Sequence, residues 1–587
     1  MLLLSALEIF LTWAVIALAL IGLGSIVLAL FSEDHSLIDS FWMGFAISVA
    51  TLEIWNLVLP VTPLIALFLF GFGLFALALS RSKLSASLLA AWQNSPWLLL
   101  LGIAFALLLA LRSCGPCEYG DTGLYGAPSV RWIQTYPAVP GLANLHGRLG
   151  FNSSVFLCIA ALGQGPWKDL GFHLFTGFLL AAFWATLLPA CARCISGPAA
   201  TPADWFHTIL AVPAFFWTTR SRIVGTQTDE PAALVALVAA GILFADLSHD
   251  HREDDPAPTT RLVLAATLFS LAVTFKESTA VFAFFAWCLV FRTIWQTTAA
   301  PRARRLAAAL ISPAVLLLPW FARSIILSGY PLFPATIFAF PVPWKIPLSA
   351  ARWYALGVRS WGRGPDSHFE ETQGLRWLGD WLNHALRNRP SLQVPLAISI
   401  VGLAIALATR FRSGSKPRPA YPWLSLLFPG LAGILFWFVA SPDPRFAQFS
   451  IWTTAATLGA WGIASLDFQR PSSHTRPAHA SPAHKRIALA ALFLSLIWCL
   501  ISLGWKEPLR ALRGVQQPPS LPKVDLLVRH TSSGLTVYVP AQGGNCWDAP
   551  LPCTTYFDPS LRLRDPSSLR WGFTSEARAT ELQTYSW

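Results

Sequence analysis

The stretch WLLLLGIAFALLLALRS, residues 97–113, decides the fold of this chain. It is almost entirely apolar, and a run of about 20 such residues spans the hydrocarbon core of a bilayer. Comparable runs recur along most of the sequence, in which 54% of residues are hydrophobic and 12% are charged. Soluble domains carry roughly 25% charged residues. The composition therefore predicts an all-α polytopic membrane protein.

The apolar runs predict about 14 transmembrane helices. The short segment FNSSVFLCIAALGQG, residues 151–165, is not among them, because it is too short to span comfortably and is expected to lie at the membrane surface. The predicted spans are 3–32, 37–59, 62–80, 95–112, 170–190, 204–219, 229–247, 261–275, 278–296, 305–327, 391–409, 421–440, 446–466 and 486–504.

With this set of spans, the basic breaks in the sequence all fall on one side of the membrane. Such breaks mark the cytoplasmic side, so the loop EYGDTGLYGAP at 118–128, the loop 328–390 and the C-terminal tail are expected on the exported face. The net charge of +12 is modest for 587 residues and is largely placed in short loops. The lipid bilayer is therefore the expected partner, and nucleic acid is not. The basic breaks are residues 81–83, 191–194, 249–254, 301–305, 410–418 and 469–486.

Composition also divides the chain into parts. The tail begins with a linker, QQPPSLPK at 516–523, and contains the strand-like run LTVYVPA at 535–541, so we expect a small exported α/β appendage. The predicted parts are N-terminal additional helices at 1–94, a membrane core at 95–330 with a first exported loop at 113–169, an exported loop at 328–390, C-terminal helices at 391–505 and the tail at 506–587.

Four of the nine cysteines fall on the predicted exported face, where disulfides form. The first expected pair is Cys546 with Cys553, and the second is Cys114 with Cys117. Sequence alone does not fix this connectivity, and a zinc site built from all four is the alternative.

Carboxylates directly follow the apolar run at 97–113. Asp121 and Glu118 lie in the first predicted exported loop, and the amphipathic stretch after them, residues 124–137, could lie along the membrane surface. A carboxylate held at the boundary of water and lipid can act as a general base toward a hydroxyl group. The plainer interpretation is that both acids solvate a loop or cap the next helix.

Further charged residues begin or interrupt later spans. Asp229 and Glu230 occur in TDEPAAL, which is also typical of a helix N-terminus. Lys276 interrupts an apolar stretch in AVTFKESTAV, and an ammonium group is costly there unless it is paired or offered to an anion. The neighbouring Glu277 could neutralise it.

The order of these motifs resembles the GT-C superfamily of polyprenyl-phosphate-sugar glycosyltransferases. A loop Asp, a surface helix, Thr-Asp-x-Pro at 228–231, Thr-x-Lys at 274–276 and Pro-Trp at 319–320 follow one another within residues 95–330. The nearest likeness is to the bacterial branch of aminoarabinose and protein O-mannosyl transferases. The resemblance implies that Asp121 is the catalytic base, that Asp229 helps to hold the acceptor or a metal, and that Lys276 contacts the donor phosphate.

The implied function is transfer of a sugar from a polyprenyl-phosphate donor to a cell-envelope glycan, lipid or protein on the exported face of a bacterial inner membrane. Two features depart from the family pattern. Four spans precede the loop, where the family has one, and the string GLANLHGRLGFNSS at 141–154 replaces a proline-centred signature. This string resembles that of an uncharacterised subfamily of bacterial membrane proteins. Its His146 and Arg148 could contact donor phosphate or acceptor, or could simply form a turn.

Glycosyl transfer from a lipid phosphate needs a base for the acceptor hydroxyl and cations beside the leaving phosphate. Arg323 and Arg445 could equally be snorkelling anchors at the interface. A divalent cation, Mg²⁺ or Mn²⁺, could bind between Asp121, Asp229 and Glu230, although no dense ligand motif demands one. Glu118 is a further candidate for contact with the acceptor or a metal. The candidate cationic side chains are Lys276, Arg220, Arg222, Arg323 and Arg445.

Two other functions remain open on the sequence. A flippase or transporter for a lipid-linked saccharide would show broken helices and ionisable groups near the middle of the membrane in related halves, and the sequence shows no convincing pair. An O-antigen-polymerase-like enzyme would depend on arginines in a large exported loop, which the loop 328–390 could supply.

Overall fold

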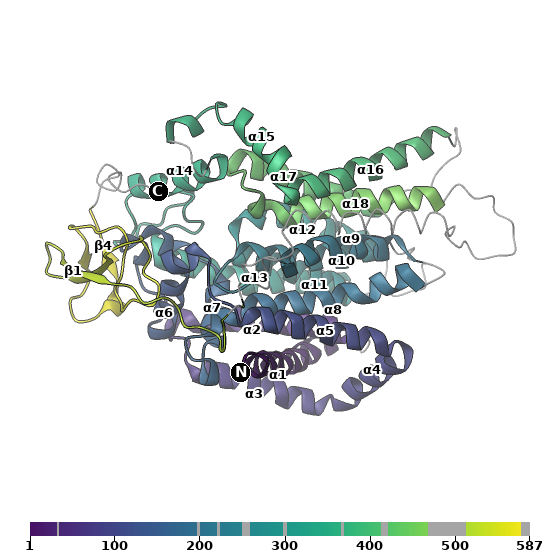
Figure 1. Cartoon of the computed structure of the whole chain (residues 1–587), viewed down its shortest axis with the longest axis horizontal. Helices are drawn as coiled ribbons and strands as arrows, with labels where there is room; N and C mark the ends of the chain where they lie inside the picture. Colours follow the sequence, from purple (N-terminus) through teal and green to yellow (C-terminus); the bar gives the residue numbers. More distant parts are fainter. Residues whose placement is uncertain are drawn as a thin grey trace, which may run out of the picture.

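The computed structural model describes residues 1–576 apart from several gaps, and it forms a bundle of long helices that run side by side (Figure 1). The gaps are 32–34, 197–199, 220–222, 249–258, 297–301, 365–368, 413–420, 468–511 and 513. The predicted span 486–504 and the candidates Arg220 and Arg222 lie outside the described residues.

The first half of the chain contributes most of the bundle. Ser36 caps α2 by accepting a hydrogen bond from the backbone N–H of Asp39, and prolines begin α3 and α5, where their missing N–H costs nothing. The helices are α1 (Leu2–Ala29), α2 (Leu37–Val58), α3 (Pro63–Leu79), α4 (Arg81–Asn94), α5 (Pro96–Ser113), α6 (Ala127–Thr135), α7 (Ser154–Leu162), α8 (Phe175–Ser196), α9 (Pro202–Thr219) and α10 (Asp229–Leu247).

The second half adds further helices and then the strands of the tail. The bounds are α11 (Thr259–Phe275), α12 (Ala280–Gln296), α13 (Arg302–Ser328), α14 (Leu348–Arg363), α15 (Leu378–Asn388), α16 (Pro390–Arg412), α17 (Leu427–Ala440), α18 (Gln448–Asp467), β1 (Leu526–His530), β2 (Thr536–Pro540), β3 (Arg562–Leu563) and β4 (Phe573–Thr574).

Nine helices among the described residues are long and apolar enough to cross a membrane, or ten if α3 and α4, bent by 75°, form one broken span. The chain is therefore a polytopic helical membrane protein, but the predicted number of about 14 spans is not reached in this part of the chain. Helices such as α18 are less apolar than these nine because their buried faces carry polar residues, including Ser450, Thr453 and Thr457. A face that packs on protein need not be as apolar as one that meets lipid.

Small residues allow the closest helix contacts. A Cβ atom added at Gly44 of α2 would lie 1.9 Å from the carbonyl oxygen of Leu20 in α1, and one at Gly402 of α16 would lie 2.4 Å from that of Leu458 in α18. Only glycine fits at these crossings, which lets the backbones approach and replaces the hydrophobic drive that lipid does not provide.

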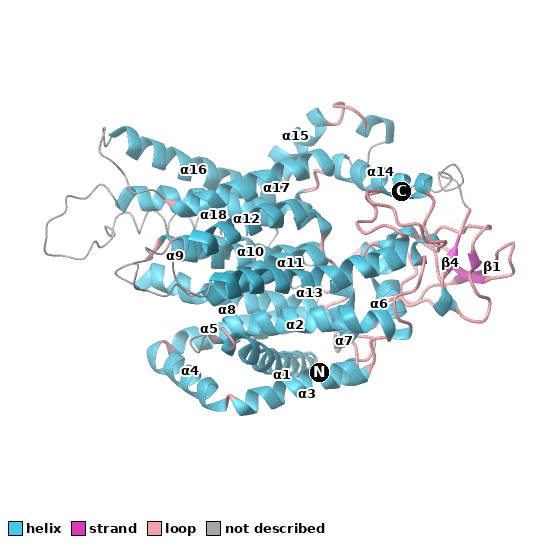
Figure 2. Ribbon diagram, turned by 180° about the vertical axis from the view of Figure 1, so that it is seen from behind, coloured by secondary structure: helices cyan, strands magenta, loops and turns pink. Residues whose placement is uncertain are grey.

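One end of the bundle is covered by residues 113–169, 328–364 and 514–576 (Figure 2). We call it the capped end. There, α7 has nine residues, of which all but Leu162 are buried, and packs against α2, α3 and α6. The segment 151–165 thus does not cross the bundle, as predicted, but it lies inside the protein rather than on a surface. Its apolar side chains, such as Phe156, fill a core with Leu52 and Ile65.

The tail forms two small antiparallel sheets, β1 with β2 and β3 with β4. The expectation of an α/β appendage is wrong for the described residues 514–576, where the only helical turn is the 3-10 turn Leu569–Trp571. Proline and glycine recur every few residues in this segment, and neither supports a continuing α-helix.

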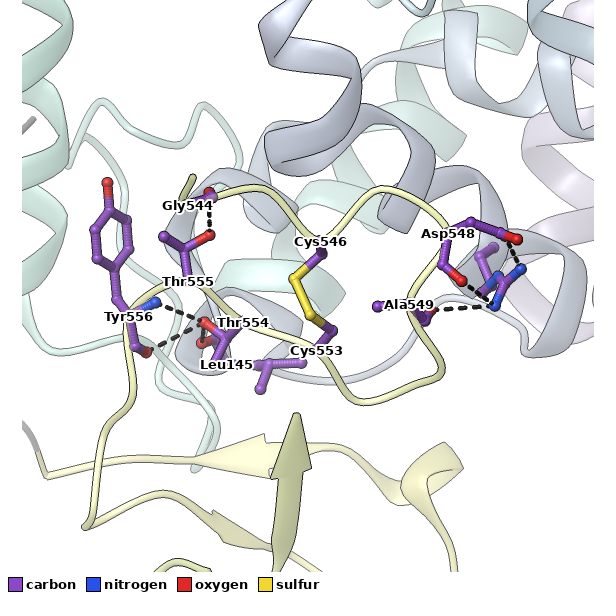
Figure 3. Close-up of a disulfide and its surroundings, with 10 residues drawn as sticks. Leu145, Gly544, Cys546, Asp548, Ala549, Cys553, Thr554, Thr555 and Tyr556 are labelled. Carbon is purple, nitrogen blue, oxygen red and sulfur yellow. Dashed lines mark hydrogen bonds and ion pairs between the residues drawn. A yellow bond between two sulfur atoms is a disulfide. The ribbon is translucent and has the colours of Figure 1, made fainter. Parts of the chain in front are cut away.

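Cys546 and Cys553 form the predicted disulfide within the tail (Figure 3). The second predicted pair does not form, and Cys114 and Cys117 are free thiols. Cys114 ends α5 with its thiol directed back to the carbonyl oxygen of Ala110, 3.4 Å away, while Cys117 packs beside Gly225. The four cysteines therefore do not gather into the alternative zinc site.

Candidate functional site

Asp121 lies at the capped end, on a turn that links two helices. It precedes a π-helical segment, Thr122–Gly126, which leads directly into α6. Such segments occur frequently at functional sites. The hydroxyl oxygen of Thr122 accepts a hydrogen bond of 3.0 Å from the backbone N–H of Thr226, so the turn is fixed against the approach to α10. The carboxylate of Asp121 remains 26% exposed.

Two guanidinium groups flank this carboxylate. Arg148 lies 3.9 Å from one oxygen of Asp121, and Arg445 lies 3.5 Å from the other. Arg445 also donates a hydrogen bond of 2.8 Å to the hydroxyl of Tyr119. Both contacts to Asp121 are long for charge-assisted hydrogen bonds, which are shorter than about 3 Å. The carboxylate is thus close to two cations without being tightly held by either.

Arg445 connects Asp121 to a second carboxylate. Its Nε atom lies 3.9 Å from Asp229 and 3.3 Å from Asp443, which caps the turn that carries Arg445. Asp229 is 4% exposed and pairs with Lys276 at 2.7 Å, so Asp229 rather than Glu277 is the close partner of this ammonium group. Lys276 also lies 4.4 Å from the centre of the Phe446 ring. We call Asp121, Arg148, Asp229, Lys276 and Arg445 the ionic cluster.

Two tyrosines pack around the ionic cluster. Burial raises the pKa of Tyr119 well above its ordinary value, and burial likewise raises the pKa of Tyr125. Both phenols are therefore neutral and keep their protons. Tyr125 also lies under Arg148, whose guanidinium carbon is 6.0 Å from the ring centre. The tyrosines supply a hydroxyl partner and an aromatic surface, and no further charge.

The ionic cluster does not fit a divalent cation. Arg445 already lies between the carboxylates of Asp121 and Asp229, and Lys276 engages Asp229 from the other side. No group of three or more His, Cys, Asp or Glu side chains among the described residues could hold a metal ion. We therefore derive no step through a metal.

A family model described as a domain of unknown function (DUF8201) matches residues 7–452 of the chain. The chain belongs to the DUF8201 family. Comparisons with curated proteins and with solved structures found no match. The DUF8201 match contains all five residues of the ionic cluster and begins within α1, so the N-terminal helices lie inside the matched region. It ends before the strands of the tail.

Other predicted residues are not members of the ionic cluster of this DUF8201 protein. Glu118 is exposed, and Glu230 is half-buried in the first turn of α10. His146 is buried with its ring 5.2 Å from that of Tyr556. Burial, helped by Arg148, lowers the pKa of His146 to about 3, so it is neutral and cannot serve as a cation for phosphate.

Arg323, also predicted as a phosphate ligand, is not part of the ionic cluster. It is 4% exposed within the helix bundle, where it donates to the side-chain oxygens of Asn56, at 3.1 Å, and of Asn152. Glu53 of α2 lies nearby, fully buried, and accepts a hydrogen bond from Ser154. Sequence reasoning overlooked Glu53, although a carboxylate inside a predicted span was the signal that could have found it.

The string GLANLHGRLGFNSS at 141–154 connects several helices of the bundle. Asn152 and Trp320 exchange two hydrogen bonds, Asn152 donating at 2.6 Å and the Trp320 indole at 2.7 Å. Ser153 donates at 2.8 Å to the carbonyl oxygen of Phe275, the residue before Lys276. The string therefore fixes α2, α11 and α13 relative to one another beneath the ionic cluster.

Two of the cavities that the described residues form are lined by no residue of the ionic cluster. One of about 330 Å³ adjoins Asp39 and Arg261, at the end of the bundle opposite the cap. The other, of about 540 Å³, is at the capped end and is lined by residues that include Arg131 and Lys168. The side chains of Asp121, Lys276 and Arg445 are 26%, 25% and 23% exposed, so the ionic cluster is partly open.

Proposed function

We propose that this DUF8201 protein is a membrane glycosyltransferase that moves a sugar from a polyprenyl-phosphate donor to an acceptor in the cell envelope. The carrying observation is the position of Asp121, which is partly exposed at the capped end and lies between Arg148 and Arg445. A general base thereby lies directly beside two cations that could bind a phosphate, as this reaction requires.

In the proposed reaction, an oxygen of Asp121 accepts the proton of the acceptor hydroxyl as that hydroxyl attacks the anomeric carbon of the donor. The bond between this carbon and the phosphate oxygen breaks, and its electron pair leaves with the polyprenyl phosphate. Arg445, Arg148 and Lys276 stabilise the negative charge that grows on the phosphate. Attack opposite the leaving group inverts the configuration of the sugar.

The long contacts of Asp121 support this assignment of roles. Arg148 and Arg445 hold the carboxylate at 3.9 and 3.5 Å, so a donor phosphate can take over these guanidinium groups and leave Asp121 free to accept a proton. Arginine also matches phosphate oxygens with two parallel hydrogen bonds. The 2.7 Å pair between Lys276 and Asp229 is tighter and instead fixes the ammonium group beside the site.

We place the capped end on the exported face of a bacterial inner membrane. Basic residues in the described loops and helix ends support this orientation, because they lie at the other ends of the helices and cytoplasmic ends are rich in Lys and Arg. These residues are Arg81, Arg193, Arg304 and Arg410, at the start of α4, the end of α8, the start of α13 and the end of α16.

The test is transfer of radiolabelled sugar from polyprenyl-phosphate hexoses and pentoses by the full-length protein in liposomes. Wild type is compared with Asp121→Asn, and Glu118→Gln serves as the matched control because its carboxylate is exposed outside the cluster. Transfer that is lost only in Asp121→Asn supports the proposal. Transfer that survives this change removes Asp121 from the mechanism and favours the arginine-dependent polymerase.

A flippase for lipid-linked saccharides is the second candidate, and the buried groups Glu53 and Arg323 favour it. Ionisable side chains inside a helix bundle are typical of transport pathways. The same liposomes distinguish the two functions. Movement of labelled lipid between leaflets without sugar transfer, retained in Asp121→Asn and lost in Glu53→Gln, would identify a flippase.

A further inference from the structure

We propose that Trp547 of the tail is a positioning residue that fixes the turn carrying Asp121. This inference rests on the proposed function for its catalytic consequence. The contact joins a residue outside the family match to a segment inside it. Trp547 lies beyond residue 452, and Asp121 lies within the match. The loop that carries Trp547, residues 546–553, is called the disulfide loop below.

Trp547 touches the turn through both its backbone and its ring. Its backbone N–H donates a hydrogen bond of 2.9 Å to the carbonyl oxygen of Gly123, two residues after Asp121. Its ring covers the open face of the same glycine so closely that an added Cβ atom would lie 2.3 Å from a ring carbon. Gly123 lies in the π-helical segment, whose wide turn leaves the room that the indole fills.

The neighbours of Trp547 hold the disulfide loop on α6. Arg131 of α6 donates hydrogen bonds of 3.2 and 3.1 Å to the carbonyl oxygens of Asp548 and Ala549, and it also pairs with the carboxylate of Asp548. At the other end of the loop, Thr554 donates a hydrogen bond of 2.9 Å to the carbonyl oxygen of Leu145 (Figure 3). The loop is thus fixed on both sides of the indole.

The disulfide closes residues 546–553 into a covalent ring. Cys546 and Cys553 are bonded to each other, and Figure 3 shows Asp548 and Ala549 in the loop between them. Trp547 belongs to the same loop. Trp547 has a φ of +42°, in the left-handed region that non-glycine residues avoid. Such a backbone persists where the surroundings determine it, and here the cross-link and the bonds to Gly123 and Arg131 do so.

Asp121 must stand between two guanidinium groups that come from other segments, with contacts of 3.5 and 3.9 Å. A small shift of its turn therefore changes which cation it meets. Misplacement of a reacting group by about 1 Å can lower a rate by about a hundredfold. The indole of Trp547 prevents this shift, because Gly123 has no side chain with which to anchor the turn itself.

The experiment compares full-length wild type with Trp547→Ala, Trp547→Phe and the double change Cys546→Ser/Cys553→Ser, all in the same liposomes. Glu576→Gln is the control, because its ion pair with Arg562 is an exposed contact elsewhere in the tail. Two readouts are taken: deuterium uptake by peptides covering residues 118–131, and kcat and KM for sugar transfer.

In Trp547→Ala we expect faster uptake confined to residues 118–131 and a kcat lowered by about ten- to a hundredfold, with little change in donor KM. Trp547→Phe restores most of both values, the double cysteine change resembles Trp547→Ala, and Glu576→Gln resembles wild type. Unchanged uptake in Trp547→Ala would overturn the proposal. Faster uptake with unchanged kcat, or faster uptake throughout the protein, would also overturn it.

The two proposals fail separately. If wild type transfers no sugar from any donor, the glycosyltransferase function is wrong. Deuterium uptake by residues 118–131 that becomes faster when the Trp547 ring is removed would then still support the inference that Trp547 fixes the turn. If wild type is active and Trp547→Ala matches it in both readouts, only the positioning role is wrong.

Discussion

Arg445 lies 3.5 Å from Asp121, although one residue is on the turn before α18 and the other follows α5. This ion pair joins the first and last parts of the family match at the capped end of the bundle. The same guanidinium reaches Asp229 at 3.9 Å. A cation thus occupies the place between two carboxylates where a metal ion would otherwise be expected.

The first prediction concerns Asp121. Asp121→Asn keeps the size of the side chain but removes its basicity, so sugar transfer should fall by about a hundredfold or more, the range for a lost general base. Its ion pairs are long and partly exposed, so the free energy of unfolding should change by about 1 kcal/mol or less. Transfer assays and thermal unfolding in detergent measure the two effects, and a large loss of stability would assign Asp121 a structural role instead.

The second prediction concerns the shape of the cation at position 445. Arg445→Lys keeps the charge but loses the fork that reaches Tyr119, Asp121 and Asp229 together, and lysine does not replace a guanidinium at such a site. We expect donor KM to rise by about tenfold, equivalent to about 1.4 kcal/mol of lost binding. Kinetics with a polyprenyl-phosphate donor measure it. Wild-type kinetics in this variant would show that charge alone suffices.

The third prediction concerns Asp229 and Lys276. Removing either partner leaves the other without its closest countercharge, so Asp229→Asn and Lys276→Met should each destabilise the protein by about 3 kcal/mol. The double variant should be less destabilised than the sum, by about 1–3 kcal/mol. Denaturation of the four proteins gives this coupling energy directly. A sum that is strictly additive would mean that the 2.7 Å pair contributes no net stability.

The fourth prediction is a pH dependence caused by His146. Burial lowers the pKa of His146 from 6.5 to about 3, with Arg148 adding to the effect. The unfolded chain therefore binds more protons than the folded protein between these values, and stability should fall as the pH falls from about 6.5, by up to about 1.4 kcal/mol per unit. His146→Gln should flatten this slope in thermal unfolding at pH 4 to 7, and an unchanged slope would exclude His146 as its source.

The fifth prediction concerns the buried groups beneath the cluster. Arg323→Met removes the donor to Asn56 and Asn152 and leaves Glu53 without a nearby cation, so we expect a loss of about 3–5 kcal/mol. Combining it with Glu53→Gln should recover part of this loss, because the uncompensated carboxylate is then gone. Unfolding in detergent tests both variants. A stable Arg323→Met protein would mean that this network contributes little.

The apolar runs alone are enough to predict a helical chain that crosses a membrane many times, because a backbone in lipid must satisfy its own hydrogen bonds and long apolar runs can do so only as helices. The sequence also indicated the disulfide between Cys546 and Cys553. It did not distinguish this pair from Cys114 and Cys117, since the spacing of cysteines in the sequence says nothing about where the end of α5 directs a thiol.

Which charged residues share a site depends on the tertiary fold. Arg323 and Arg445 both stand beside the end of a predicted span and read alike in sequence. Arg323, however, is buried and donates to Asn56 and Asn152, whereas Arg445 reaches Asp121 and Asp229. The contact between Trp547 and Gly123 joins segments more distant still. Such meetings depend on how helices cross and how the tail folds back over them, and no local pattern in the chain encodes that geometry.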